Sequence, residues 1–295
     1  MQKTPVIIDT DIGSDIDDTW ALGLLLKSPE LDLKLVTTVT QDTPYRAKIA
    51  AKLLEIAGRT DVDVGLGPRE TETWGPQASW VMDYDLAGYP GQIHENAIEA
   101  LVNAILSSPE PVTIITIGPL TNIALALEKE PEIASRARIM GMLGSIRSGY
   151  NGKPSPDPEY NVIQDVSACR AVFSAPWEIT ITPLDTCGTV VLSGEQYEAI
   201  SRSNDPITAS IVENYEIWAF AHGNTKKLDK SSVLFDTVAV YLAISEDFTA
   251  MEMLDLAISD KGMMHVDENG RPVRCATDWR GNCEYEDWLV QRLLS

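Results

Sequence analysis

The stretch VIIDTDIGSDIDDTWALGLLL, residues 6–26, joins a short apolar run to five aspartates and then to a second apolar segment. The run before Asp9 is rich in β-branched residues, which is typical of a buried strand. Asp17 and Asp18 open a segment with helical spacing that stops at Pro29. Acidic residues stabilise the first turn of a helix because the helix dipole is positive there. The stretch therefore predicts a strand, an acidic loop and a helix.

The same alternation of short apolar runs and longer helical patterns continues along the chain. Further strands are predicted at 33–40, 62–65, 111–118, 137–143 and 177–185, and helices at 45–59, 95–107, 120–131, 165–174, 194–202, 206–222, 233–245 and 284–294. This order predicts an α/β fold with an open, mostly parallel, Rossmann-like sheet that carries helices on both faces. A turn at Asn269-Gly270 predicts a small C-terminal hairpin. We expect a single domain over residues 1–295.

The composition argues against several classes of partner. The 295 residues include 23 Lys and Arg against 44 Asp and Glu, which gives a formal net charge of −21. Such a charge repels phosphate backbones and anionic lipids, so neither a nucleic acid nor a membrane is expected as a partner. The four cysteines form no CxxC pair, and Asp9 interrupts the N-terminus before the apolar core of a signal peptide could form. These features predict a cytoplasmic protein with free thiols.

The five aspartates of residues 9–18 need a counter-charge. After Lys3 the next basic residue along the chain is Lys27, so no local side chain supplies it. Acids at a helix N-terminus often serve only as caps, which accounts for two carboxylates but poorly for five behind a buried strand. Carboxylates are hard oxygen ligands, and they favour Ca²⁺ or Mg²⁺ over zinc or copper. The cluster therefore predicts a divalent cation site.

A second interpretation of the same residues is a phosphatase of the haloacid-dehalogenase type. Asp9 and Asp11 form a D-x-D pattern after the first strand, in which Asp9 would be the nucleophile of a Mg²⁺-dependent reaction. The pattern is short, and it leaves the acidic pair Asp17-Asp18 without a role. The lysine and the later acidic pair that such an enzyme requires have no clear candidate in the chain.

Four ordered stretches resemble the inosine/uridine-preferring nucleoside hydrolase family. They are DTDIGSDIDD at 9–18, IGPLTNIALAL at 117–127, PEYNVIQD at 158–165 and LFDTVAVYL at 234–242. The first is two residues longer than the family's fingerprint between Gly13 and the aspartate pair. The resemblance spans most of the chain, and it implies the nucleoside hydrolase fold, a nucleoside substrate and a homodimer or homotetramer.

The resemblance also implies a set of site residues. A Ca²⁺ ion would be held by Asp11, Asp18, Asp236 and the backbone carbonyl of Ile117. The ribose would be bound by Asp17, Asp42, Glu159 and Asn161, and either Tyr150 or Asn151 would reach its 5′-hydroxyl. Asp9 would orient the amides of the acidic loop from behind the ligands.

The reaction implied by the resemblance is Ca²⁺-dependent hydrolysis of the N-glycosidic bond of ribonucleosides to ribose and free base. Asp11 would act as the general base on the attacking water. Many relatives carry a histidine directly before the last metal-binding aspartate, and this chain has Phe235 there. His222 is the best substitute as the acid that protonates the departing base. The alternative is a non-catalytic nucleoside or ribose binder that lacks this acid.

Overall fold

A single sheet organises the chain, in the order β4-β3-β2-β1-β5-β6-β7-β10-β8-β9 within the described residues, 3–295 of the computed structural model. Neighbouring strands from β4 through β10 run parallel, whereas β8 runs antiparallel to β10 and to β9. The strands are β1 (Thr4–Thr10), β2 (Leu31–Thr38), β3 (Asp63–Leu66), β4 (Ile93–His94), β5 (Val112–Thr116), β6 (Ala137–Met142), β7 (Ile179–Thr182), β8 (Thr249–Ile258), β9 (Met264–Val266) and β10 (Arg271–Trp279).

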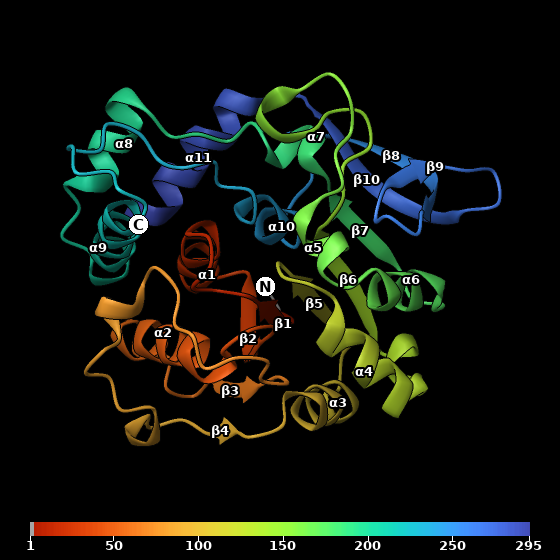
Figure 1. The fold of residues 1–295 in the computed structure, drawn as a ribbon, viewed down its shortest axis with the longest axis horizontal. Helices are drawn as coiled ribbons and strands as arrows, with labels where there is room; N and C mark the ends of the chain where they lie inside the picture. The colour runs from red at the N-terminus through yellow and green to blue at the C-terminus, as the bar shows by residue number, and fades with distance from the viewer. Residues whose placement is uncertain (1–2) are drawn as a thin grey trace.

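Helices cover both faces of the sheet, as the alternating pattern predicts (Figure 1). In β1, Val6 and Ile8 enter one hydrophobic core while Ile7 enters the other, because successive side chains of a strand point to opposite faces. The first core is covered by α1 (Asp17–Leu26), α2 (Thr43–Ile56), α7 (Leu184–Cys187), α8 (Gly194–Ser201), α9 (Pro206–Ala221), α10 (Thr237–Leu242) and α11 (Asn282–Leu294), and the second by α3 (Ala97–Ser107), α4 (Thr121–Lys129) and α6 (Val166–Ser174).

The order of the strands reverses at β1, which lies between β2 and β5. The loops that follow β1 and β5 therefore leave the same edge of the sheet in different directions and open a crevice there, the usual ligand site of such sheets. A backbone hydrogen bond joins these loops' starting points, from the Ile117 N–H to the Asp9 carbonyl at 2.9 Å. The acidic loop after β1 is thus fixed at this crevice.

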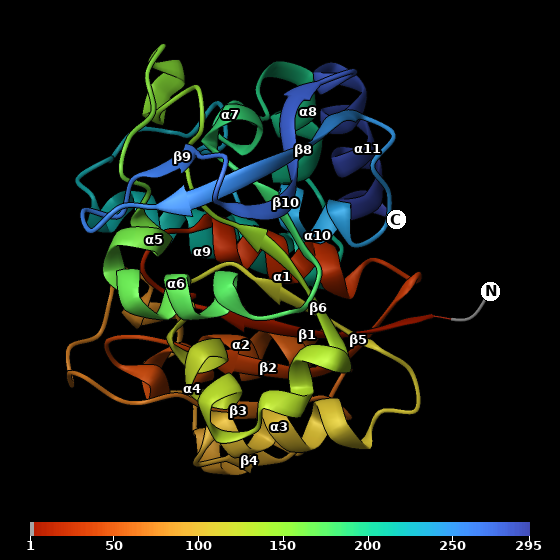
Figure 2. The ribbon, with the colours of Figure 1, turned by 90° about the vertical axis from the view of Figure 1, so that its right-hand side faces the viewer.

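Helix α1 is buried on nearly all sides, which fixes the position of its acidic first turn. Its residues from Asp17 to Leu25 are all buried, so the helix is apolar around its whole circumference beyond that turn. Trp20 is fully buried and meets the ring of Tyr215 in α9 edge-on, with 6.2 Å between the ring centroids. Burying an aromatic side chain of this size contributes about 2–3 kcal/mol. Figure 2 shows α1 enclosed between the sheet and the later helices.

The structure differs from the sequence-based prediction at two places near the C-terminus. Helix α10 covers Thr237–Leu242 only, rather than 233–245, because Asp236 is its N-cap and the preceding residues lead into the crevice. The antiparallel hairpin is formed by β8 and β9, whose connection closes with a hydrogen bond from the Gly262 N–H to the Ser259 carbonyl. The turn at Asn269–Gly270 instead leads from β9 to β10 on the opposite edge of β8.

Two further expectations concern thiols and membranes. Within residues 3–295 all four cysteines are free, and three of them are buried while Cys283 is exposed. None of the helices in this range combines the length and the apolar character that crossing a bilayer requires.

Gly270 permits the close approach of the β9–β10 turn to β8. A Cβ atom at this position would lie 2.7 Å from the backbone of Leu256, whereas a Cβ atom at Gly88 would lie 3.6 Å from Asp85. We predict that Gly270→Ala lowers the free energy of unfolding by about 1–3 kcal/mol through overpacking, and that Gly88→Ala changes it by less than about 0.5 kcal/mol. Urea denaturation measures both, and equal stabilities of the two variants would contradict this packing.

Candidate active site

A cavity of about 420 Å³ lies at the carboxyl edge of the sheet, at the crevice beside β1. Its volume is in the range of pockets that bind small molecules. Four of the five N-terminal aspartates contribute to it, together with residues from the later motifs. The lining residues are Asp11, Ser14, Asp15, Asp17, Asp18, Ile117, Met142, Tyr150, Glu159, Tyr160, Asn161, Trp218, His222, Phe235 and Asp236.

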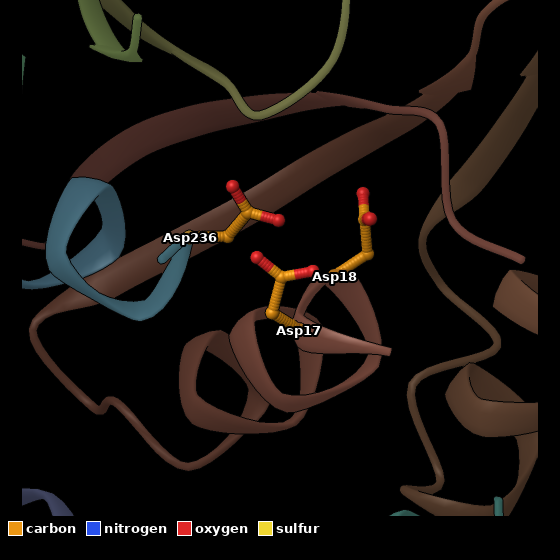
Figure 3. A group of neighbouring side chains, drawn as sticks. All are labelled: Asp17, Asp18 and Asp236. Carbon is orange, nitrogen blue, oxygen red and sulfur yellow. The ribbon is translucent and has the colours of Figure 1, made fainter. Parts of the chain in front are cut away.

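Three of these carboxylates form one buried cluster. Asp17, Asp18 and Asp236 each offer an oxygen within 4.8 Å of the others, and each side chain is at most 4% exposed. Figure 3 shows Asp17 and Asp236 turned toward each other, with Asp18 beside them on the first turn of α1. Asp17 and Asp18 are adjacent in the sequence, whereas Asp236 comes from the N-terminus of α10. The fold therefore brings together the first and the last of the four stretches that resemble the family, residues 9–18 and 234–242.

The three carboxyl groups of the cluster destabilise one another when they are ionised. Burial, and then repulsion by the neighbouring carboxylates, raises the pKa of Asp17, Asp18 and Asp236 well above the usual range. Within residues 3–295 none of the three forms a salt bridge. Asp18 accepts one hydrogen bond, from the Thr10 hydroxyl. An uncompensated buried charge of this size is costly unless a cation is bound or protons are taken up.

The donor set fits a hard divalent cation. Carboxylate and carbonyl oxygens are the ligands that Ca²⁺ and Mg²⁺ prefer, and Ile117, whose carbonyl is a further candidate ligand, lines the same cavity. Among the cavity-lining residues there is no lysine, arginine or cysteine. The residues that could hold the ion are therefore Asp18, Asp236 and the Ile117 carbonyl, together with Asp17 from the cluster or Asp11 from the same cavity.

Asp11 lies in the same cavity but outside the three-residue cluster. The guanidinium of Arg46 lies 3.9 Å from the Asp11 carboxylate and also donates hydrogen bonds to the carbonyls of Asp11 and Ile12. Burial raises the pKa of Asp11 and the charge of Arg46 opposes that shift. No neighbouring residue in the sequence supplies a counter-charge to the acidic loop, but Arg46 reaches Asp11 from α2.

Glu159 and Asn161 form the opposite wall of the cavity. Glu159 is the N-cap of α5 (Tyr160–Gln164) and accepts hydrogen bonds from the backbone N–H groups of Asn161 and Gly144, at 2.7 and 2.9 Å. Burial raises the pKa of Glu159 to about 7, although these N–H groups oppose the shift. The amide of Asn161 donates to the carbonyl of Met142 at 3.1 Å. Both side chains are thus held rigidly beside the cavity.

Aromatic residues and His222 form the outer part of the cavity. The ring of His222 lies on the indole of Trp218 with 4.3 Å between centroids, and its Nδ1 is 2.8 Å from the Trp218 carbonyl. A carbonyl only accepts, so Nδ1 carries the proton of the neutral ring and Nε2 is its acceptor. Phe235 meets Tyr150 edge-on at 6.1 Å between centroids. Phe235 therefore forms part of the cavity wall.

Three sequence-predicted residues do not line the cavity. Asp42 is the N-cap of α2 and pairs with Arg69 at 3.0 Å. Asn151 is exposed in the loop beyond Tyr150, with a left-handed backbone φ of 59°. Asp9 is fully buried behind the cavity.

The Asp9 side chain lies among hydrogen-bond donors of the protein interior rather than in the cavity. Its carboxylate accepts hydrogen bonds from the Thr37 hydroxyl and from the Asn122 amide at 2.8 Å, instead of from the amides of the acidic loop. Burial raises the pKa of Asp9 to about 7. Asp9 has no access to the cavity, so the phosphatase interpretation loses its nucleophile.

Several residues at the site were not predicted from the sequence. Ser14 and Asp15 line the cavity from the two-residue extension of the acidic loop, and Tyr160 lies directly before Asn161. Arg46 is 1% exposed despite its charge. Its position among the apolar residues of YRAKIAAKLL was the one available signal, because a charged residue on a buried helix face requires a partner.

Fold and site together define an α/β protein with a carboxylate-rich cleft at the switch point of its sheet. A family model described as inosine-uridine preferring nucleoside hydrolase matches residues 6–286, and the chain belongs to this family.

Individual relatives agree with this assignment. The non-specific ribonucleoside hydrolase RihC of Escherichia coli (strain SE11) is 27% identical over 270 residues, which cover 88% of this chain and 85% of that protein. The fold is similar to that of a plant nucleoside hydrolase, with a TM-score of 0.83 and 24% identity over 100% of both chains. It is also similar to an inosine-uridine preferring nucleoside hydrolase from Bacillus anthracis, with a TM-score of 0.79 and 20% identity over 99% of both chains.

The carboxylate cluster predicts stabilisation by a divalent cation. We expect Ca²⁺ at about 100 times its Kd to raise the free energy of unfolding by about 2.7 kcal/mol, and a chelator to reverse this gain. Asp236→Asn should reduce the Ca²⁺-dependent increment, whereas Asp83→Asn, at an exposed position, should leave it unchanged. Thermal or urea unfolding with and without Ca²⁺ measures the increment, and an equal increment in both variants would contradict the site.

Proposed function

We propose that the chain catalyses Ca²⁺-dependent hydrolysis of the N-glycosidic bond of ribonucleosides, with ribose and free base as products. The observation that carries the proposal is the buried cluster of Asp17, Asp18 and Asp236 in the same cavity as Asp11 and Glu159. A cation site beside further carboxylates suits a reaction in which positive charge develops on a sugar. The family membership of the chain supports this substrate class.

The ion would be held by Asp18, Asp236, the Ile117 carbonyl and an oxygen of Asp11 or Asp17. When bound, Ca²⁺ lowers the pKa of a water molecule and accepts further oxygen ligands. Asp11 is the residue that we assign as general base, because it lies in the cavity but outside the tight cluster. Arg46 fixes the backbone that carries this carboxylate.

The remaining carboxylates bind and stabilise the sugar. We assign Asp17, Glu159 and Asn161 to hydrogen bonds with the ribose hydroxyls, and Tyr150 rather than the exposed Asn151 to the 5′-hydroxyl, because these four residues line the cavity. Cleavage of a glycosidic bond passes through an oxocarbenium-like transition state. Fixed negative charges in a water-poor cavity stabilise that positive charge more than they would in water.

His222 is our candidate for the acid that protonates the departing base. It lines the outer part of the cavity, and its Nε2 makes no hydrogen bond within the described part of the chain. The side chain of Phe235 cannot donate a proton, so the acid must come from another element. Asp42 has no role in the proposal because it pairs with Arg69 away from the cavity.

A non-catalytic nucleoside binder is the second candidate function, and the presence of Phe235 in the cavity wall is the observation that favours it. An activated riboside such as p-nitrophenyl riboside needs no protonation of its leaving group. Turnover of this substrate would show that the site hydrolyses ribosides when no acid is needed for the leaving group. Binding of ribose without turnover of any riboside would instead support the binder.

The assignment of Asp11 predicts a large loss of rate with little loss of stability. Asp11→Asn should lower kcat by about 10²–10⁴, the usual contribution of a general base, when Ca²⁺ is added at a saturating concentration. Release of reducing sugar from inosine and uridine measures the rate, and Asp83→Asn is the control for loss of a carboxylate elsewhere. A near-normal rate for Asp11→Asn would remove Asp11 as the base.

The assignment of His222 predicts a difference between leaving groups. His222→Ala should lower kcat/KM for natural nucleosides by about 10²-fold or more, and it should change turnover of p-nitrophenyl riboside far less. His265→Ala, at a histidine outside the cavity, is the matched control. Equal losses on both kinds of substrate would reject the acid role.

A further inference from the structure

The loop between β6 and α5, residues 143–159, carries two residues of the cavity wall, Tyr150 and Glu159. The loop folds back on its own end. The Gly144 N–H donates to the Glu159 carboxylate at 2.9 Å, and the Tyr160 N–H, directly after the loop, donates to the Tyr150 hydroxyl at 2.9 Å. The position of this loop therefore decides where Tyr150 lies in the cavity.

One carboxylate outside the cavity holds the first part of the loop. Asp185, in α7, accepts hydrogen bonds from three consecutive backbone N–H groups. These groups belong to Ile146, Arg147 and Ser148, and the distances are 2.9, 2.7 and 3.2 Å. Residues 143–149 form no helix or strand, so the carboxylate takes the place of the backbone acceptors that regular structure would supply. Hydrogen bonds to an ionised group are stronger than those between neutral groups, and Asp185 therefore fixes the loop to α7.

A second set of hydrogen bonds connects this part of the loop to Tyr150. The Ser145 hydroxyl donates to the Ser148 carbonyl at 2.7 Å and accepts from the Asp157 N–H at 2.9 Å. The Asp157 carboxylate in turn accepts from the Tyr150 N–H at 3.1 Å. A shift of residues 146–148 is therefore transmitted to Tyr150, although Asp185 itself does not line the cavity.

The Tyr150 hydroxyl is left with a free proton. It accepts from the Tyr160 N–H, and within residues 3–295 its own O–H has no acceptor. The ring packs edge-on against Phe235, which limits its rotation. A phenol both donates and accepts, so this O–H is available to an acceptor oxygen of a molecule bound in the cavity.

We propose that Asp185 is a positioning residue that places the Tyr150 hydroxyl to donate to the 5′-oxygen of a bound ribonucleoside. The inference rests on the proposed function, and it adds a determinant of substrate specificity that lies outside the cavity. Without the Asp185 carboxylate, residues 146–148 lose their acceptor and Tyr150 moves out of hydrogen-bonding position. The site then no longer distinguishes a nucleoside from its 5′-deoxy analogue.

The test is a ratio of two specificity constants at saturating Ca²⁺, kcat/KM for inosine divided by kcat/KM for 5′-deoxyinosine. Loss of folded protein lowers both constants equally, so a merely destabilising substitution leaves the ratio unchanged. We compare the wild type with Asp185→Asn, Tyr150→Phe and the double variant. Asp85→Asn is the matched control, because the Asp85 carboxylate also accepts from a backbone N–H, that of Ala87 at 3.1 Å, but lies outside the cavity.

The wild type should favour inosine at least about 100-fold, as sites built around a specific hydrogen bond do. Asp185→Asn keeps one oxygen but turns N–H groups toward the loop, and it should lower the ratio at least about tenfold, because small misplacements of a contacting group have large effects. Tyr150→Phe should lower the ratio at least as much, and the double variant should match Tyr150→Phe. Asp85→Asn should keep the wild-type ratio.

An unchanged ratio in Asp185→Asn, or a further loss in the double variant as large as in the single one, would overturn the inference while the hydrolytic function stands. A wild type that cleaves both nucleosides equally well would do the same. If Asp185→Asn does not fold, Ser145→Ala removes the second set of hydrogen bonds and should also lower the ratio, and an unchanged ratio there would overturn the inference. A wild type that cleaves no nucleoside in the presence of Ca²⁺ would overturn both proposals, so the two failures are distinguishable.

Discussion

Mutual repulsion among three buried carboxylates is the constraint on which the rest of this structure depends. Asp17, Asp18 and Asp236 are brought within 4.8 Å of one another with almost no exposure to solvent. Such an arrangement is stable only when a cation or protons compensate the charge. The cluster is therefore best explained as the protein's part of an ion site, and the packing of α1 and α10 keeps its carboxylates together.

The fold meets this constraint with rigid elements rather than with loops. Two aspartates occupy the first turn of α1, a helix that is apolar on all sides and enclosed by the sheet, α9 and α10. The third stands at the N-terminus of α10, which is itself fully buried. Both helix N-termini face the crevice beside β1, and their dipoles favour the negative charges that they carry. Arg46 adds a fixed positive charge behind Asp11.

Much of the fold could be predicted from the sequence, because its signals are local. The apolar run before Asp9 and the helical pattern after Asp18 specify a strand and a helix, and their repetition specifies a parallel sheet with two covered faces. The C-terminal strands were harder to predict. The Asn269-Gly270 turn signals a tight turn correctly, but whether the strands on either side pair with each other depends on the distant strand β8.

Most of the candidate site could be predicted because its residues belong to contiguous motifs, and Tyr150 and His222 are the exceptions that lie outside them. Asp17, Asp18, Glu159 and Asn161 fall in such motifs and line the cavity together. The proximity of Arg46 to Asp11 arises from the packing of α2 against the acidic loop, and no sequence period encodes such a contact.

The same limit applies to the contacts that surround predicted residues. The position of the His222 ring over Trp218, and the hydrogen bond from the Trp218 indole to the Ser14 carbonyl, follow from where α9 ends in space. Asp42 matches a family position in sequence, and in the structure it caps α2 and pairs with Arg69.

A crystal structure of the chain grown with Ca²⁺ and ribose tests directly whether the carboxylates share one ion. We expect one ion about 2.3–2.6 Å from oxygens of Asp18 and Asp236, with ribose hydroxyls on its open side and Asp11 beside the anomeric carbon. An empty carboxylate cluster at saturating Ca²⁺, or an ion bound elsewhere with ribose outside the cavity, would contradict it.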